Sequence, residues 1–443
     1  MRRLYSLLIS CAAPLAFATV LWRGLRDRSY WQGLGERFGR GRALGGGPSI
    51  WLHAVSLGEM TAAAPLVRAL RSRYPESPVM LTCATPTGRV YARAQFGDSA
   101  DVRFLPYDMP GAVARFFDRA RPQVAIIMET ELWPNLFGEC VRRGVPLVLA
   151  SARLSAKSVS RYRRLGGLFR GVLSGISLIA AQTDEDARRF LAIGAQPART
   201  RVVGNIKFDL ELNAGILARG RELRASFGST RSLWVAGSTH AGEEEQVLAA
   251  HEELLAYRPD ALLLLVPRHP DRFSAVAELL RRRKVRFAQR STGLMPDGAT
   301  EVVLVDTVGE LAALYASADV AFVGGSLVPI GGHNLLEPAA LGVPVLTGPS
   351  HDNGQEIAAL LIERGAALQV SNARELAAVL KRLLAEPEER QRMGAAGRHI
   401  VESNRGSVAR LLGLIEPLLP GPPSPDPSKD RTAAPPARPS AGR

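Results

Sequence analysis

The sequence is poor in cysteine and in aromatic residues, and each shortage excludes a class of protein. Cys11, Cys83 and Cys140 are the only cysteines among 443 residues. They form neither a CxxC pair nor an even disulfide framework, which favours a reducing compartment. Aromatic residues make up 6% of the chain, and the densest basic run, Arg281-Arg282-Arg283-Lys284, contains none. Proteins that stack bases interleave aromatic and basic side chains, so we do not expect a nucleic-acid partner.

Patterns for metal and dinucleotide binding are missing as well. The seven histidines have no ligand spacing, and no GxGxxG follows the first predicted strand. Asp184-Glu185-Asp186 is the nearest approach to an acidic metal motif, but Thr183 and Asp186 also have the spacing of a helix cap. We therefore predict a site without metal or cofactor, in which arginine and helix dipoles neutralise a phosphate.

Positive charge is abundant. The net charge is +14, with a pI near 10.4. A basic surface attracts nucleic acid, anionic lipid or phosphorylated small molecules, and the first of these is already disfavoured. The expected partners are therefore an anionic membrane and a phosphorylated ligand.

The N-terminus predicts a membrane anchor over residues 1–25. Residues 4–21 carry no charge, and a membrane span needs about 17–25 residues. The basic residues that follow, from Arg23 to Arg42, favour a body held on the cytoplasmic side of the membrane. Two alternatives stay open: a signal peptide cleaved after Ala16-Phe17-Ala18, and a shallow helix kinked at Pro14.

Strand and helix patterns alternate twice along the rest of the chain. Such alternation indicates doubly wound parallel sheets, so we predict an α/β protein with Rossmann-like domains over 26–209 and 210–420. Residues 421–443 are rich in proline and serine and are predicted to be disordered. The expected strands are Ser49–Val55, Val79–Thr82, Val124–Met128, Val145–Ala150, Leu178–Ala181, Leu233–Ala236, Leu262–Val266, Val302–Val305, Val320–Val323 and Val343–Leu346.

Polar side chains follow several of these strands, where ligands of open α/β sheets bind. Glu59 follows the first strand; it is a candidate functional carboxylate, but Ser56-x-x-Glu59 is also a capping box. Glu129 stands directly after another strand and is harder to explain as a cap. Lys207 ends the first domain, near the expected interdomain cleft.

In the second domain, Arg268 ends a strand where it can clamp a phosphate or stack on a base. The segment GGSLVPIGGHNLLEP, Gly324 to Pro338, predicts a glycine-rich loop followed by a helix capped by Asn334. Its backbone amides are expected to hold a phosphate, and Glu337 to accept from ribose hydroxyls.

Together these stretches resemble the 3-deoxy-D-manno-octulosonic acid (Kdo) transferases of lipid A assembly. The resemblance runs in order from about Leu4 to Leu419 and rests on HAVSLGE, METELWPN, SARLSAKS, GNIKFD, STHAGEEE, VPRHPDRF, DTVGEL, FVGGSLVPIGGHNLLEP and VPVLTGP. It implies the two-domain GT-B glycosyltransferase architecture with an N-terminal membrane anchor. It also implies an inverting transfer of Kdo from CMP-Kdo to a lipid A precursor (lipid IVA) in lipopolysaccharide core assembly.

The resemblance also implies residue roles. Glu59 would be the general base, and Glu129 and Lys207 would stabilise the transition state. CMP would be held by Pro267, Arg268, Val308, Gly309, Glu310, Asn334, Leu335, Leu336 and Glu337.

The sequence departs from the family pattern at Ser350, where histidine is common, and at Gly354, where phenylalanine is common; His351 is one position late. Alternatives to the implied function are another GT-B glycosyltransferase, a nucleotide-sugar epimerase, or a non-catalytic membrane-attached nucleotide-binding protein. The last of these would bind CMP and leave CMP-Kdo unconsumed.

Overall fold

Two compact units make up the chain. A computed structural model describes residues 1–164, 166–210, 212 and 215–419, without the side chain of residue 16. Unit 1 contains Met1–Asn205 and the segment from Ser407, and unit 2 contains Ile206–Gly406. The division falls four residues before the predicted boundary at 209/210, and the last helix groups with the first unit, not the second. The tail predicted to be disordered, residues 421–443, lies outside the described residues.

Unit 1 is built on a seven-stranded sheet in the order β3-β2-β1-β4-β5-β6-β7, and its paired strands are parallel. Strands β1 and β2 are buried along their whole length because helices cover both faces of such a sheet. The strands are β1 (Ser49–His53), β2 (Val79–Cys83), β3 (Asp101–Phe104), β4 (Pro122–Met128), β5 (Leu147–Ala152), β6 (Leu178–Ala181) and β7 (Thr200–Val202).

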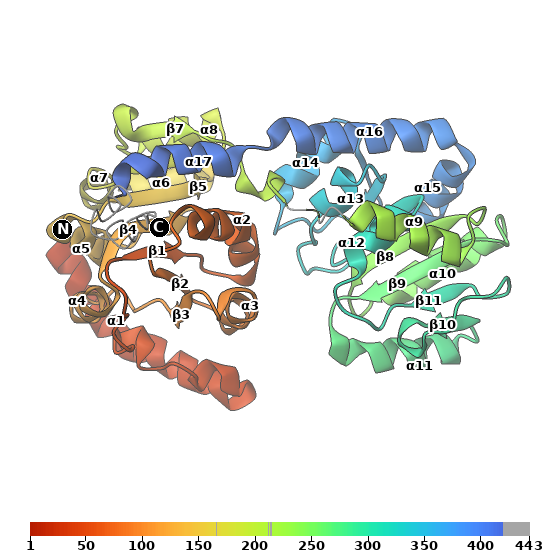
Figure 1. The fold of residues 1–443 in the computed structure, drawn as a ribbon, viewed down its shortest axis with the longest axis horizontal. Helices are drawn as coiled ribbons and strands as arrows, with labels where there is room; N and C mark the ends of the chain where they lie inside the picture. Colours follow the sequence, from red (N-terminus) through yellow and green to blue (C-terminus); the bar gives the residue numbers. More distant parts are fainter. Residues whose placement is uncertain (165, 211, 213–214, 420–443) are drawn as a thin grey trace, which may run out of the picture. The chain divides into compact units, whose positions relative to one another are not determined.

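The helices of unit 1 connect and cover these strands (Figure 1). The last of them, α17, follows the whole of unit 2 in sequence yet packs against α2. They are α1 (Arg2–Arg26), α2 (Leu57–Arg73), α3 (Pro86–Phe96), α4 (Pro110–Ala120), α5 (Pro134–Arg143), α6 (Ala156–Arg164), α7 (Gly166–Leu173), α8 (Asp184–Ala192) and α17 (Ser407–Ile415), with the 3-10 turns η1 (Arg28–Trp31), η2 (Glu36–Phe38), η3 (Pro197–Arg199) and η7 (Glu416–Leu418).

Unit 2 repeats the plan, with strand order β10-β11-β9-β8-β12-β13-β14. Side chains alternate between two cores: Trp234 and Ala236 pack on one face of the sheet, and Leu233 and Val235 on the other. The strands are β8 (Leu233–Thr239), β9 (Leu262–Pro267), β10 (Phe287–Gln289), β11 (Val302–Leu304), β12 (Val320–Val323), β13 (Val345–Thr347) and β14 (Ala367–Gln369). The helices are α9 (Ile216–Phe227), α10 (Glu244–Leu255), α11 (Phe273–Arg282), α12 (Leu311–Ser317), α13 (Leu336–Ala340), α14 (Gln355–Glu363), α15 (Ala373–Ala385) and α16 (Pro387–Asn404), with the turns η4 (Ile206–Phe208), η5 (Pro270–Arg272) and η6 (Arg290–Thr292).

Helix α1 is long and apolar enough to cross a membrane, judged by length and composition alone. It has no acidic residue in its first turn, and Arg23 and Arg26 lie in its last turn. The predicted anchor is therefore a helix.

Candidate functional site

In unit 1, two predicted residues flank the point where the strand order reverses. Strands β1 and β4 pair directly, although β2 and β3 come between them in sequence. Glu59 lies in the first turn of α2 after β1, and Glu129 directly follows β4. Ligands of open α/β sheets bind outside the carboxyl ends of strands at this switch point.

Glu59 serves as a helix cap. Ser56 is the N-cap of α2, and its Oγ accepts from the Glu59 amide at 3.4 Å. The Glu59 Oε2 accepts in return from the Val55 amide at 2.9 Å. The predicted capping box is thus confirmed, and the role of Glu59 as a base stays a prediction.

Glu129 has a strained backbone. Its φ of 53° lies in the left-handed region, which residues other than glycine rarely occupy. Its side chain is only 14% exposed and pairs with Arg153, whose Nε lies 3.1 Å from Oε2. Burial raises the pKa of the neighbouring Glu131 carboxyl, and the charge of Glu129 raises it further. Strain of this kind concentrates at functional sites. Glu129 is therefore harder than Glu59 to explain by a structural role alone.

Lys207 lies in the 3-10 turn η4, at the beginning of unit 2. Its neighbours Ile206 and Phe208 are buried and fix the turn, while Lys207 itself is half-buried. The predicted catalytic set is therefore divided, with two carboxylates in unit 1 and the lysine in unit 2.

In unit 2 the switch point lies between β8 and β12, and a buried carboxylate organises it. Glu243 is fully buried. Its Oε1 accepts from the amides of Ser326 at 3.1 Å and Leu327 at 2.9 Å, and its Oε2 from those of Gly325 at 2.7 Å and His240 at 3.2 Å. The prediction that the amides of this loop hold a phosphate is wrong for Gly325, Ser326 and Leu327, because Glu243 already occupies them.

The glycines of the loop are explained by the same packing. A Cβ on Gly324 would lie 2.6 Å from the Glu243 Oε2 and 2.7 Å from the Ser238 carbonyl oxygen. Gly332 has a φ of +73°, and its amide donates to the Gly325 carbonyl. The glycine-rich sequence thus makes room for a folded loop around a buried carboxylate.

Three histidines that the sequence did not single out gather beside this loop. The rings of His240 and His333 stack with centroids 5.0 Å apart, and their Nε2 atoms lie 2.8 Å apart. His269 packs edge-on against His240 at 5.5 Å. They come from the loops after β8, β12 and β9, so only the sheet topology brings them together. Among the described residues no group of three His, Cys, Asp or Glu side chains could hold a metal ion.

Arg268 is close enough to this cluster to influence its protonation. Burial, together with the smaller effect of the Arg268 charge, lowers the pKa of His333 to about 4. Burial raises the pKa of the Glu337 carboxyl, an effect that Asn334 and Arg268 oppose. Arg268 is exposed, and no described residue pairs with its guanidinium. Arg268 is thus close to Glu337 and Asn334, and among the described residues it is a cation without an ion-pair partner.

The other residues predicted to contact CMP differ in how exposed they are and in whether they already have partners. Glu310 pairs with Arg290 at 3.1 Å, and this hydrogen bond lowers the pKa of the carboxyl. Val308 is 77% exposed, and a Cβ on Gly309 would meet open space. Pro267, Leu335 and Leu336 are buried, so a ligand would reach them through the backbone. The Asn334 Oδ1 accepts from the Leu336 amide at 3.1 Å, but α13 is only five residues long and its N-cap is Leu335, not Asn334 as predicted.

The histidine cluster gives a pH prediction. His333 has a folded pKa of about 4 against an ordinary value of 6.5, so between these values only the unfolded chain binds the proton. The free energy of unfolding should therefore fall as the pH is lowered from 6.5 towards 4. His333→Asn should flatten this fall, measured by urea unfolding across that range. The exposed His399 on α16 gives the control: His399→Asn should keep the wild-type slope, and equal slopes in all three proteins would contradict the assignment.

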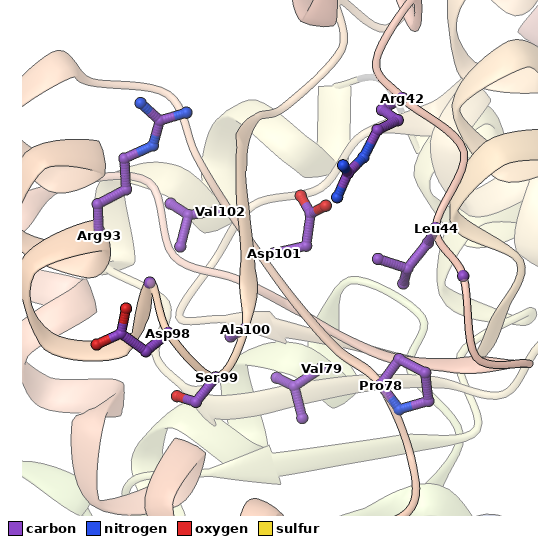
Figure 2. A pocket seen from close by; sticks show the side chains of 12 residues that line it. Arg42, Leu44, Pro78, Val79, Arg93, Asp98, Ser99, Ala100, Asp101 and Val102 are labelled. Atoms are coloured by element: carbon purple, nitrogen blue, oxygen red, sulfur yellow. The ribbon is translucent and has the colours of Figure 1, made fainter.

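One cavity of unit 1 lies away from these residues. It has a volume of about 580 Å³ and lies where β2 and β3 begin, at the opposite edge of the sheet (Figure 2). Arg42, Arg93, Asp98 and Asp101 supply its charges, of both signs. It is therefore separate from the switch point that carries Glu59 and Glu129.

Similarity to known proteins decides the family. A family model described as 3-deoxy-D-manno-octulosonic-acid transferase (kdotransferase) matches residues 32–210. A curated 3-deoxy-D-manno-octulosonic acid transferase of Haemophilus influenzae is 43% identical over 421 residues, which cover 94% of this chain and 99% of the relative. The chain belongs to the Kdo transferase family. Another member, from Bordetella pertussis, is 40% identical over 431 residues, with the same coverage. The protein is therefore a glycosyltransferase.

Membership in the Kdo transferase family agrees with the fold. A second model, described as glycosyl transferases group 1, matches residues 286–400 within unit 2. A UDP-GlcNAc 2-epimerase from Neisseria meningitidis, solved with UDP-GlcNAc, covers 80% of this chain and 99% of its own at 14% identity, with a TM-score of 0.51. That likeness concerns the fold alone. The two doubly wound units are those of the GT-B class, as predicted.

Ser350 and Gly354, which depart from the Kdo transferase pattern, have structural roles at or near the glycine-rich loop after β12. The Ser350 hydroxyl accepts from the Gly331 amide at 2.9 Å, and the Ser350 amide donates to the Ser326 carbonyl at 3.0 Å. Gly354 is the N-cap of α14. Ser350 thus helps to fix the glycine-rich loop instead of presenting a ring to a ligand.

Proposed function

We propose that this Kdo transferase moves Kdo from CMP-Kdo to a lipid A precursor, with inversion at the anomeric carbon. The observation that carries the proposal is the division of chemistry between the two switch points. Two carboxylates, Glu59 and Glu129, flank the one in unit 1, and the unpaired Arg268 stands beside the one in unit 2. Carboxylates beside the switch point of unit 1 suit proton removal from an acceptor, and a cation beside the switch point of unit 2 suits a phosphate-linked donor.

In the proposed reaction an acceptor hydroxyl attacks the anomeric carbon of Kdo. The new C–O bond forms as the bond to the CMP phosphate breaks, and CMP leaves with the electron pair. Glu59 takes the hydroxyl proton; its place in the first turn of α2 favours the ionised carboxylate that this role requires.

Two further residues are proposed to stabilise the transition state. Glycosyl transfer passes through an oxocarbenium-like state, whose positive charge a carboxylate such as Glu129 stabilises. Lys207 belongs to unit 2, which we propose binds the donor, and its ammonium would offset the negative charge that grows on the leaving phosphate. The reaction then needs no metal ion.

The donor half can be tested with CMP alone. Arg268→Ala should weaken CMP binding about 10- to 100-fold, because a hydrogen bond to a charged group contributes about 1.5–3 kcal/mol. Its melting temperature should not change, since Arg268 is exposed and unpaired among the described residues. Calorimetric titration gives the affinity. Arg281→Ala, on the exposed face of α11, is the control and should bind CMP as the wild type does.

The whole reaction is tested by incubating purified enzyme with CMP-Kdo, a lipid A precursor (lipid IVA) and EDTA. Mass spectrometry should show the acceptor gaining Kdo while CMP is released. Consumption of CMP-Kdo without a Kdo-bearing lipid would point to another acceptor. An unconsumed donor would point to a nucleotide-binding protein without transferase activity.

We also propose a place for the enzyme, on the cytoplasmic side of a bacterial inner membrane. Support comes from the apolar α1, its flanking arginines and the net charge of +14. Anionic headgroups attract such a surface, and the acceptor itself is an anionic lipid. A basic enzyme would therefore concentrate where its substrate lies.

A further inference from the structure

Helix α1 is tied to unit 1 at its beginning. The Tyr5 hydroxyl donates to the Asp108 Oδ2 at 3.0 Å, and the Ser6 hydroxyl donates to the Asn135 Oδ1 at 2.7 Å. Asp108 is 4% exposed and also accepts from the amides of Asn135 at 2.9 Å and Leu136 at 2.7 Å. These amides begin α5, so the first turn of α1 joins a buried polar network of the folded body. Buried polar groups are costly when they lose partners, which makes this attachment specific.

The rest of α1 is tied to the same unit. The Phe17 ring meets Phe38 of η2 edge-on, with centroids 5.3 Å apart. The Trp31 indole of η1 donates to the Leu21 carbonyl at 3.1 Å. A Cβ on Gly24 would lie 1.8 Å from the indole nitrogen, so glycine is required where Trp31 crosses the helix.

Such contacts are incompatible with a helix that crosses a bilayer. Tyr5 and Leu21 are sixteen residues apart, which corresponds to about 24 Å along a helix. In a crossing helix these two residues would lie near opposite faces of a hydrocarbon core about 30 Å thick. One folded unit cannot touch both, yet unit 1 contacts α1 from its first turn to its last.

The outer side of α1 is nevertheless apolar. Leu4, Leu8, Leu15, Trp22 and Leu25 are 57–72% exposed. Their spacing of four, seven, seven and three residues places them along one side of a helix. Water does not favour such a stripe, and the helix carries no acidic residue to repel an anionic surface.

Basic residues mark both ends of the stripe. Arg2 and Arg3 line a cavity of about 310 Å³ that also includes Asn135, where the first turn meets α5. Arg23 and Arg26 stand in the last turn. Cations at both ends of an apolar stripe match the headgroup layer of an anionic membrane.

We infer that α1 lies in the plane of the membrane surface, docked on unit 1, with its exposed stripe among the lipids of an anionic bilayer. The inference rests on the membrane attachment proposed above and is independent of the reaction. The first turn of α1 then both contacts the lipid and holds the start of α5, which follows the Glu129–Glu131 segment.

The depth of α1 in the bilayer distinguishes a helix that lies in the membrane plane from a helix that crosses the membrane. Cys11 is exposed, whereas Cys83 and Cys140 are buried, so a nitroxide can be attached to the native chain at residue 11. Leu4→Cys, Leu15→Cys and Trp22→Cys, each with Cys11→Ser, supply three more positions on the same side. The labelled full-length enzymes are placed on vesicles of phosphatidylethanolamine and phosphatidylglycerol. Depth follows from paramagnetic resonance saturation by oxygen and by a water-soluble nickel complex.

An in-plane helix should give similar depths of about 5–10 Å at all four positions. A depth near the bilayer centre at residue 11, with shallow values at residues 4 and 22, would overturn the inference in favour of a crossing helix. Labels that stay as accessible as in solution would overturn the membrane contact itself. Neither result depends on donor or acceptor, so failure of the proposed reaction would be seen separately.

Docking is tested by a second measurement. The double variant Tyr5→Phe, Ser6→Ala removes the hydrogen bonds to Asp108 and Asn135. It should lower the melting temperature of the vesicle-bound enzyme. The control is Ser10→Ala, because among the described residues the Ser10 hydroxyl donates to the Ser6 carbonyl, within the helix. Equal melting temperatures for the double variant and the control would show that α1 is not docked.

Discussion

Glu243→Ala should destabilise unit 2 by at least about 3 kcal/mol and abolish CMP binding. The carboxylate is fully buried and accepts from four backbone amides, three of them in the loop after β12. Each buried donor left without a partner costs about 1–3 kcal/mol. The loop should therefore lose its fold, and with it the placement of His333 beside Arg268.

Glutamine should not rescue this position. Each oxygen of Glu243 accepts from two amides, so in either orientation the side-chain NH₂ of glutamine would face donors. Glu243→Gln is thus expected to lose most of the stability and most of the CMP affinity. Urea unfolding and calorimetry measure the two effects. The exposed neighbour Glu245 supplies the control, since Glu245→Gln should change both only slightly. If Glu243→Ala unfolds at the wild-type urea concentration, the carboxylate does not hold the loop.

The central strands could be predicted from sequence, but the edge strands could not. The predicted apolar runs correspond to β1, β2, β4, β5 and β6, and to β8, β9, β11, β12 and β13. The four unpredicted strands, β3, β7, β10 and β14, are the edges of the two sheets. They have three or four residues, such as Thr200–Val202, and an edge strand lacks the long apolar run that burial on both faces demands.

Local chemistry of the site was predictable where it depends on short spacings. The capping interaction of Ser56 with Glu59 is present, and Thr183 caps α8 by accepting from the Asp186 amide at 3.1 Å. Long-range chemistry was not predictable. Glu243 is 82 residues from Gly325 in the chain, and its sequence position indicates only an acidic residue at the start of a helix. His240 and His333 come into contact only because β8 and β12 are neighbours in the sheet. Their contacts require the strand order, which no motif contains.

Glu59→Gln should reduce Kdo transfer about 10²- to 10⁴-fold with the melting temperature almost unchanged. The structural role of Glu59 needs only an acceptor for the Val55 amide, and the side-chain oxygen of glutamine provides one. A general base must also bind a proton, which glutamine cannot do. Transfer is measured by mass spectrometry at saturating CMP-Kdo, and melting by calorimetry, so the two roles are read separately.

Unit 2 offers a capping box that serves as the control. Asn372 accepts from the Glu375 amide at 3.0 Å, and the Glu375 Oε2 accepts from the Ser371 amide at 2.8 Å, which repeats the contacts of Ser56, Glu59 and Val55 on exposed residues at the start of α15. Glu375→Gln should therefore match Glu59→Gln in melting temperature and transfer Kdo at the wild-type rate. If Glu59→Gln also transfers at that rate, Glu59 is a cap and no more. The base would then be sought at Glu131, because burial raises the pKa of its carboxyl and it lies in the same loop as the strained Glu129.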